Sequence, residues 1–286
     1  MSSELCIPKG CGGFFYQCGV RLRGLCRFVN TNGRLPKTID WKNQFSNYKC
    51  DKQTDIDPLL FVDHTSIQIE TPHPVPVTNK RQNKFYWHHN NYSVAVPFDL
   101  LKPFIKKYFN PSNFVKKLIT DFENEHSIEY SNTIAVYYRG LDKRTEIKSV
   151  SYDVVINKAE EIFLQNPTAR FLVQTDETEF KDAFFERFPT NSFRNERMPT
   201  KSYNPDAPLE RSGIHFSTPI DERPLSAAQL LGAVIAMSKC KWVIATTSNV
   251  SLWVVLYRGN SDGVVQIGEK ETRTKRIANP LYDLSS

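Results

Sequence analysis

The sequence predicts an α/β protein in which helices cover parallel sheets. From residue 133 onward, short apolar runs alternate with longer stretches of helical periodicity, which is typical of a parallel sheet covered on both faces. Residues 5–41 show the same order once, as strand, helix and strand. The chain has 286 residues, enough for two such units, and we expect them at 1–125 and 126–286.

The first unit begins with an apolar piece at residues 5–7 and a glycine-rich turn that contains Gly12 and Gly13. Apolar residues then recur at helical spacing until Gly33, a common stop signal, and a second strand is expected at 35–41. Backbone amides in such a turn can approach an anion or a sugar, but a tight turn alone also explains the glycines.

Residues 51–97 contain several prolines and predict long loops, and one or two helices are expected at 99–125. In these loops Trp87 can either stack on a sugar ring or pack in the core, and His88 can touch a sugar. Because adjacent histidines point in different directions, a metal site formed by His88 and His89 is not expected.

The second unit consists of alternating strands and helices. Its strands are expected at 133–138, 169–174, 214–216 and 241–246. Its helices are expected at 152–165, 177–187, 226–237 and 250–257, with Ser226 as the N-cap of the third.

Composition and charge exclude several classes of protein. The net charge of +6 comes from scattered residues without a run of like charges, so a nucleic-acid-binding module is not expected. No apolar run approaches the length of a membrane span. The N-terminus lacks the basic and apolar regions of a secretory signal, so we expect a cytoplasmic protein of a bacterium or of a virus-infected cell.

The six cysteines predict neither a metal site nor disulfides. They contain no C-x2-C pair, which argues against structural zinc. A reducing compartment argues against disulfides. We therefore expect buried free thiols, with Cys18 and Cys26 near the core face of one helix.

Three predicted strands of the second unit end in polar clusters. Tyr137 and Arg139 lie at the end of the first, Asp176 follows the second, and Ser248 and Asn249 follow a third at the start of a helix. In open α/β folds ligands bind beyond the carboxyl ends of parallel strands. Arginine offers a planar fork to phosphate oxygens and a helix start offers free amides, so the clusters together suit a diphosphate.

Each of these residues also has a purely structural interpretation. Arg139 can form an ordinary salt bridge, Asp176 can cap the helix at 177–187, and Ser248 with Asn249 can cap the next helix. The chain contains neither a P-loop nor a G-x-G-x-x-G, G-x-S-x-G or H-E-x-x-H motif. ATPase, dehydrogenase, serine hydrolase and zinc protease activities are therefore not expected.

The order and spacing of the motifs resemble those of the fucosyltransferase superfamily, which includes α1,6-fucosyltransferases, nodulation fucosyltransferases and protein O-fucosyltransferases. The first motif is Arg139-Gly140-Leu141-Asp142-Lys143 with Glu146, the second Thr175-Asp176-Glu177 and the third Ser248-Asn249-Val250. The resemblance covers residues 5–41 and about 133–258, and it leaves residues 42–132 unmatched.

This resemblance implies a GT-B-like fold, in which two Rossmann-like domains with parallel sheets face a cleft. It also implies an inverting, metal-independent glycosyltransferase without a cofactor, which uses a nucleotide-sugar donor and a glycan or polysaccharide acceptor. Arg139 would hold the β-phosphate and stabilise the departing diphosphate. Asp176 would lie beside the nucleotide or order the Arg139 loop. Donor contacts are further implied for Tyr137, Lys143, His215, Ser248 and Asn249, and acceptor-side roles for Gly12, Gly13, Trp87 and His88.

The sequence departs from the family at three points. Gly140 stands where many relatives have a second arginine, Tyr137 replaces a nucleotide-binding histidine, and Glu146 lies four rather than five residues after Asp142. The general base therefore stays open among Asp142, Glu146 and a residue of the first unit. GDP-fucose is the first choice of donor. A donor such as UDP-xylose, or a non-catalytic protein that binds nucleotide or glycan, is the alternative, and His215 is equally explained as a core histidine.

Overall fold

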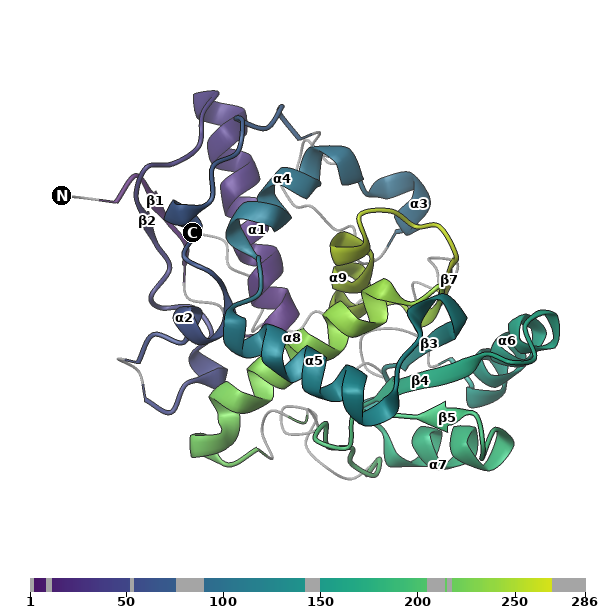
Figure 1. Ribbon diagram of the computed structural model, residues 1–286. Helices are drawn as coiled ribbons and strands as arrows, with labels where there is room; N and C mark the ends of the chain where they lie inside the picture. The colour runs from purple at the N-terminus through teal and green to yellow at the C-terminus, as the bar shows by residue number, and fades with distance from the viewer. Residues whose placement is uncertain are drawn as a thin grey trace.

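A five-stranded parallel sheet forms the centre of the second half of the chain (Figure 1). The computed structural model describes residues 3–8, 12–51, 54–75, 90–141, 150–204, 214 and 218–268. The strand order is β5-β4-β3-β6-β7. The strands are β3 (Thr133–Tyr138), β4 (Arg170–Thr175), β5 (Ser192–Phe193), β6 (Trp242–Thr246) and β7 (Val264–Ile267).

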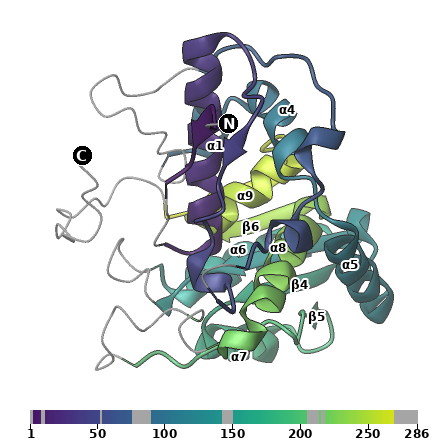
Figure 2. The same ribbon diagram turned by 90° about the vertical axis from the view of Figure 1, so that its left-hand side faces the viewer.

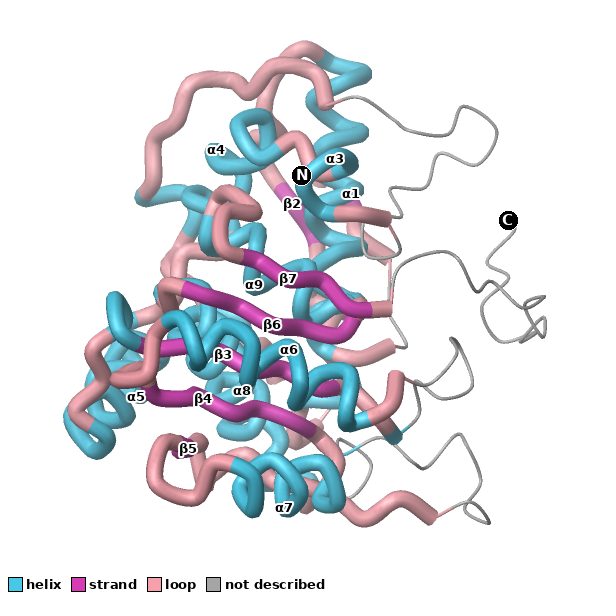
Figure 3. Tube along the Cα trace, turned by 90° about the vertical axis from the view of Figure 1, so that its right-hand side faces the viewer, coloured by secondary structure: helices cyan, strands magenta, loops and turns pink. Residues whose placement is uncertain are grey.

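Helices cover both faces of this sheet (Figure 3). One face carries Ile134, Val136 and Tyr138 and packs in a cluster with α6 (Tyr152–Gln165) and α7 (Thr178–Arg187). The other face packs in a larger cluster with α8 (Arg223–Lys239) and α9 (Asn249–Arg258). Every residue of β3 is buried, as expected for a central parallel strand with helices on both sides.

The first half of the chain is mainly helical in the part that the structure describes. Its strands β1 (Leu5–Cys6) and β2 (Ile39–Asp40) form a short parallel pair. Gly33 ends α1 with a φ of +65°, a conformation that glycine adopts without strain. Its helices are α1 (Phe14–Asn32), α2 (Asp57–Leu60), α3 (Tyr92–Ala95), α4 (Phe98–Tyr108) and α5 (Asn113–His126). Short 3-10 turns lie at Ser46–Tyr48 and His64–Ser66 in this half, and at Tyr130–Asn132 and Ile220–Glu222 in the second half.

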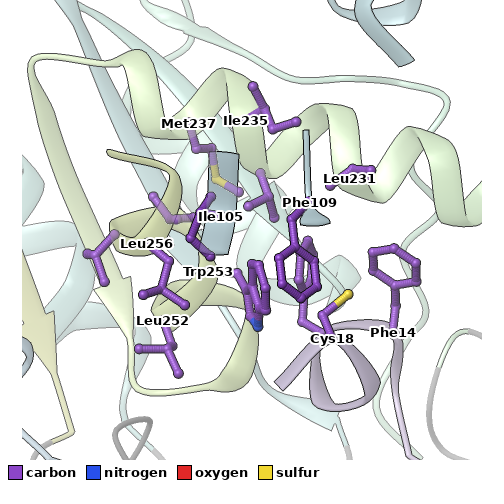
Figure 4. Close-up of a cluster of buried hydrophobic side chains, with 14 of the residues drawn as sticks. Phe14, Cys18, Ile105, Phe109, Leu231, Ile235, Met237, Leu252, Trp253 and Leu256 are labelled. Carbon is purple, nitrogen blue, oxygen red and sulfur yellow. The ribbon is translucent and has the colours of Figure 1, made fainter. Parts of the chain in front are cut away.

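One hydrophobic cluster joins the two halves of the chain. Side chains of α1, α4, α5, α8 and α9 belong to it. Figure 4 labels members from α1, α4, α8 and α9. The ring of Trp253 on α9 lies 5.7 Å from that of Phe15 on α1 and 4.7 Å from that of Phe109, which follows α4. Figure 2 shows α1 beside α9 as this packing requires. The division at residues 125 and 126 stays a prediction.

Most of the elements expected from the sequence are confirmed, within a few residues at their ends. The N-cap predicted for Ser226 is wrong, because α8 already begins at Arg223, with a proline in its first turn. Proline suits that position because the first helical N–H groups have no partner within the helix. The sequence analysis missed β5 and β7, and of the strand predicted at 214–216 only residue 214 lies among the described residues.

The cysteine prediction is correct in part. Cys18, Cys26 and Cys240 are buried free thiols, and burial raises the pKa of Cys26 and of Cys240 to about 12. Cys6 and Cys50 are exposed, so for them the expectation of burial is wrong.

Among the helices that the structure describes, none is both long enough and apolar enough to cross a bilayer.

Candidate functional site

The strand order places a topological switch point between β3 and β6. From β3 the chain continues outward to β4 and β5, and from β6 it continues outward to β7 on the other side. Tyr137 of β3 pairs in register with Gln174 of β4 and with Ala245 of β6, so these three strands end at one edge. Such an edge is where ligands bind in open α/β sheets.

Arg139 and Asp176 meet at this edge. Nη1 of Arg139 lies 3.2 Å from Oδ2 of Asp176, and these side chains are 21% and 8% exposed. The other carboxylate oxygen of Asp176 accepts a hydrogen bond from the backbone N–H of Gly140 at 3.0 Å. The backbone N–H of Arg139 donates to Oγ1 of Thr246 at 2.9 Å, across the switch point. Asp176 therefore orders the backbone after Arg139.

The structure excludes one of the predicted roles of Asp176, that of a helix cap. The N-cap residue of α7 is Glu177, and Asp176 lies one residue before it, so the capping interpretation is wrong. The carboxylate of Asp176 instead binds the chain that follows the neighbouring strand. An arginine carries five N–H donors in its fork, more than a single carboxylate engages, so the ion pair with Asp176 is compatible with phosphate binding.

Ser248 begins α9 at the same edge through a capping box. Its Oγ accepts a hydrogen bond from the backbone N–H of Ser251 at 3.1 Å, and Oγ of Ser251 accepts one from the backbone N–H of Ser248 at 2.9 Å. The capping interpretation is therefore confirmed for Ser248, whose side chain is buried. Asn249 is the first helical residue and is half-buried. The positive end of the helix dipole lies here.

Tyr92 of α3, in the first half of the chain, is hydrogen-bonded to the start of α9. Its hydroxyl lies 2.8 Å from Oγ of Ser251 and donates to the carbonyl of Ser248 at 3.2 Å. Its backbone N–H donates to Gln266 of β7, whose amide donates in turn to Oγ1 of Thr247. Tyr92 is 1% exposed, and burial raises its pKa above the usual value.

Sequence reasoning missed both Tyr92 and Glu177. Nothing in the spacing of the chain indicates Tyr92, because its partners lie more than 150 residues away. Glu177 belongs to a predicted motif, but it was assigned no role of its own. The structure places it fully buried beside Gly140.

Gly12 and Gly13 lie at the start of α1. A Cβ on Gly12 would lie 2.5 Å from Cδ1 of Tyr16, so this position is too tight for any other residue unless the ring moves. The side chain of Gln17 donates to the carbonyl of Gly12 at 2.9 Å, and Tyr48 accepts the N–H of Phe14 at 2.8 Å. The tight-turn interpretation accounts for these contacts, and the acceptor-side role of both glycines stays a prediction.

The remaining predicted site residues lie outside the described part of the chain, and their roles stay predictions. They are Asp142, Lys143, Glu146, His215, Trp87 and His88.

No group of three or more histidine, cysteine, aspartate or glutamate side chains is arranged to hold a metal ion among the described residues. Metal independence stays a prediction as well.

A broad groove of about 730 Å³ lies elsewhere, between residues 68–73, α4 and the C-terminal end of α9. Because α9 begins at the strand edge and runs away from it for ten residues, this groove is separate from the Arg139 site.

The architecture is an α/β fold with parallel sheets, and solved structures with a GT-B-like fold are similar to it. Comparison with solved structures found the α-1,6-fucosyltransferase NodZ. NodZ soaked with GDP-fucose is 14% identical, with a TM-score of 0.50 over 88% of this chain and 91% of that chain. NodZ co-crystallised with GDP is also 14% identical, with a TM-score of 0.50 over 90% and 92% of the two chains.

A third NodZ structure, from Bradyrhizobium, is 13% identical, with a TM-score of 0.46 over 89% and 92%. No protein-family model and no curated protein sequence matches the chain. The resemblance to the fucosyltransferase superfamily, with its GT-B-like fold, is thus confirmed at the level of fold.

Proposed function

We propose that this protein is a glycosyltransferase that transfers fucose from GDP-fucose to a glycan or polysaccharide acceptor. The observation that carries the proposal is the position of Arg139. It lies at the switch point, paired with Asp176 and hydrogen-bonded through its backbone to Thr246. The NodZ structures of the same fold were obtained with GDP-fucose and with GDP, which supports the choice of donor.

In this proposal Arg139 stabilises the leaving group. As the glycosidic bond to the sugar lengthens, negative charge builds up on the β-phosphate, and a preorganised guanidinium stabilises that charge. The ion pair with Asp176 holds the guanidinium in one orientation before the donor binds, so little freedom is lost on binding. In this proposal the transfer is inverting. It also needs no metal, because a cationic side chain stabilises the leaving diphosphate as a metal does in other transferases.

The start of α9 contributes a second positive element. The hydroxyl of Ser248 is engaged in the capping box, so its contribution is to hold the first turn rather than to touch phosphate. The backbone N–H groups at the start of a helix and the helix dipole both favour an anion. Asn249, half-buried at this point, adds a side-chain contact to phosphate or ribose.

An inverting transfer also needs a base that removes the proton of the acceptor hydroxyl. Asp142 and Glu146, together with a residue of the first half, are the candidates that the sequence offers. Lys143 would assist the phosphate or pair with one of these carboxylates.

Calorimetric titration with GDP, UDP, GDP-fucose and UDP-xylose, each with and without EDTA, tests the proposal. We expect binding of GDP that is insensitive to EDTA, and slow hydrolysis of GDP-fucose. Preference for UDP would retain the transferase and discard fucose. GDP binding without any hydrolysis or transfer would favour the non-catalytic binding protein.

Arg139→Ala and Arg187→Ala form a matched pair for the same titration. Arg187 also has a carboxylate partner, Glu160, but it lies on the surface of α7. Loss of GDP binding in the first variant alone would support the role of Arg139. Equal binding in both variants would remove the basis of the proposal.

A further inference from the structure

Glu177 is a fully buried carboxylate at the carboxyl end of the sheet, two residues after β4. Its exposed fraction is 0%. Burying a carboxylate is costly unless polar partners surround it, so such a residue calls for an explanation. The predicted second motif contains Glu177 but gives it no role of its own, and the residues around it belong to the Arg139 site.

The carboxylate packs directly against the backbone that follows Arg139. A Cβ placed on Gly140 would lie only 1.6 Å from Oε2 of Glu177, so the acid occupies the space of a side chain at position 140. An arginine at this position, as in many members of the family, would require the acid to move. Glycine at 140 and the long acid at 177 therefore form one packing unit.

Glu177 also contacts two residues that precede it in the chain, Tyr152 and Thr175. Its Oε1 accepts a hydrogen bond from the hydroxyl of Tyr152 at 2.8 Å, and its backbone N–H donates to Oγ1 of Thr175 at 3.1 Å. Tyr152 is the first residue of α6. One side chain thus connects the end of β3, through Gly140, with the start of the next helix.

Asp176 and Glu177 hold the backbone at Gly140 from two sides. Asp176 accepts the N–H of Gly140 and binds the guanidinium of Arg139, while Glu177 packs on the Cα of Gly140. The two neighbouring acids therefore contact the backbone of the same residue through different atoms.

We propose that Glu177 is a positioning residue that sets the backbone at Gly140 and, through it, the approach of Arg139 to the β-phosphate of the donor. The inference rests on the proposed function, in which Arg139 binds that phosphate. Glu177 itself touches no substrate, because its side chain is enclosed by protein.

The affinities for GDP and GMP measure this role directly. The ratio of their dissociation constants reports the contact with the β-phosphate, whereas a purely structural residue would change the melting temperature and leave the ratio unaltered. Glu177→Asp withdraws the carboxylate by one methylene from Gly140. A displacement of this kind is expected to reduce the preference for GDP over GMP about tenfold.

The double variant is the sharper test. Gly140→Ala alone inserts a methyl group where the carboxylate lies, and we expect it to reduce the preference by at least as much as Glu177→Asp. In Gly140→Ala with Glu177→Asp, the shorter acid leaves room for the methyl group. The double variant is therefore expected to recover part of the preference, because contacting residues are not additive.

Tyr152→Phe provides a variant of nearly unchanged volume in case Glu177→Asp does not fold, and it should reduce the preference in the same direction. Glu123→Asp is the matched control. Glu123 accepts a hydrogen bond from Tyr130 at 2.8 Å, but this pair lies before the start of β3, at the other end of the strand. The ratio of the dissociation constants of GDP and GMP is expected to be the same in Glu123→Asp as in the wild type.

The outcomes separate this inference from the proposed function. If Arg139→Ala abolishes the preference for GDP while the Glu177, Gly140 and Tyr152 variants keep it, Glu177 is not a positioning residue. The same conclusion follows if the effects of Gly140→Ala and Glu177→Asp simply add. If the wild type shows no preference for GDP over GMP, the proposed function itself fails.

Discussion

Tyr92→Phe removes the hydroxyl oxygen that is hydrogen-bonded to the start of α9, where phosphate is proposed to bind. The hydroxyl of Tyr92 lies 2.8 Å from Oγ of Ser251 and donates to the carbonyl of Ser248. Neither partner is left without a hydrogen bond, because Ser251 also donates to the carbonyl of Thr246 and the carbonyl of Ser248 also accepts the N–H of Leu252. The cost is therefore that of a net hydrogen bond, about 1 kcal/mol, rather than that of an orphaned buried group.

For a chain of this length, such a loss lowers the melting temperature by about 2 °C. The same change loosens the first turn of α9, whose interaction with an anion is worth up to about 1 kcal/mol at a partly exposed site. We therefore expect GDP to bind about threefold to fivefold more weakly. Thermal unfolding measures the first effect, and calorimetric titration with GDP measures the second.

Tyr257→Phe is the control on the same helix. The hydroxyl of Tyr257 donates to the carbonyl of Phe109 at 2.9 Å, near the opposite end of α9. A similar loss of stability is expected, without an effect on GDP affinity. Equal weakening of GDP binding by both substitutions would refute the argument, as would a Tyr92→Phe variant that binds GDP like the wild type.

Three further predictions concern other parts of the molecule. Arg139→Ala should lower the transfer rate about 10²–10³-fold, and a fully active variant would exclude the phosphate role. Because the change also removes the ion-pair partner of the buried Asp176, it should lower the free energy of unfolding by about 1–3 kcal/mol. Gly33→Ala should cost about 1 kcal/mol in urea unfolding, because the φ of +65° strains any residue with a Cβ although no described atom lies within 4 Å of it; an unchanged midpoint would contradict this. Burial lowers the pKa of His64 below its usual value of 6.5. Because the unfolded chain then binds the proton at a higher pH than the folded protein, the free energy of unfolding should fall as the pH drops below 6.5. In His64→Gln this fall should be smaller, and an identical pH dependence of urea unfolding would contradict the assignment.

Local patterns predicted the elements of this fold wherever an element is long enough to show a period. The helix that ends at Gly33 and the strand at 133–138 are both evident from apolar spacing and a stop signal. β5 has two residues, too few for any periodicity, and its place in the sheet depends on pairing with Phe171 and Leu172 of β4. The start of α8 was misplaced because a serine inside the first turn looks like a cap when only the sequence is considered.

The candidate site divides in the same way. Sequence order alone put Arg139, Asp176 and Ser248 at the ends of parallel strands, and the rule for such strands then brought them to one edge. What each side chain does there depends on its partners. Asp176 accepts the N–H of Gly140, 36 residues away, instead of capping its own helix.

By itself, then, the sequence determined the α/β class, the parallel sheet and the edge at which the polar strand ends gather, because these follow from periodicity and from strand order. Only the tertiary structure decided that Tyr92 supports the start of α9 and that Glu177 fills the space beside Gly140. The physical reason is that these contacts join residues far apart in the chain. Their geometry arises from the packing of several elements, and no spacing along one segment encodes it.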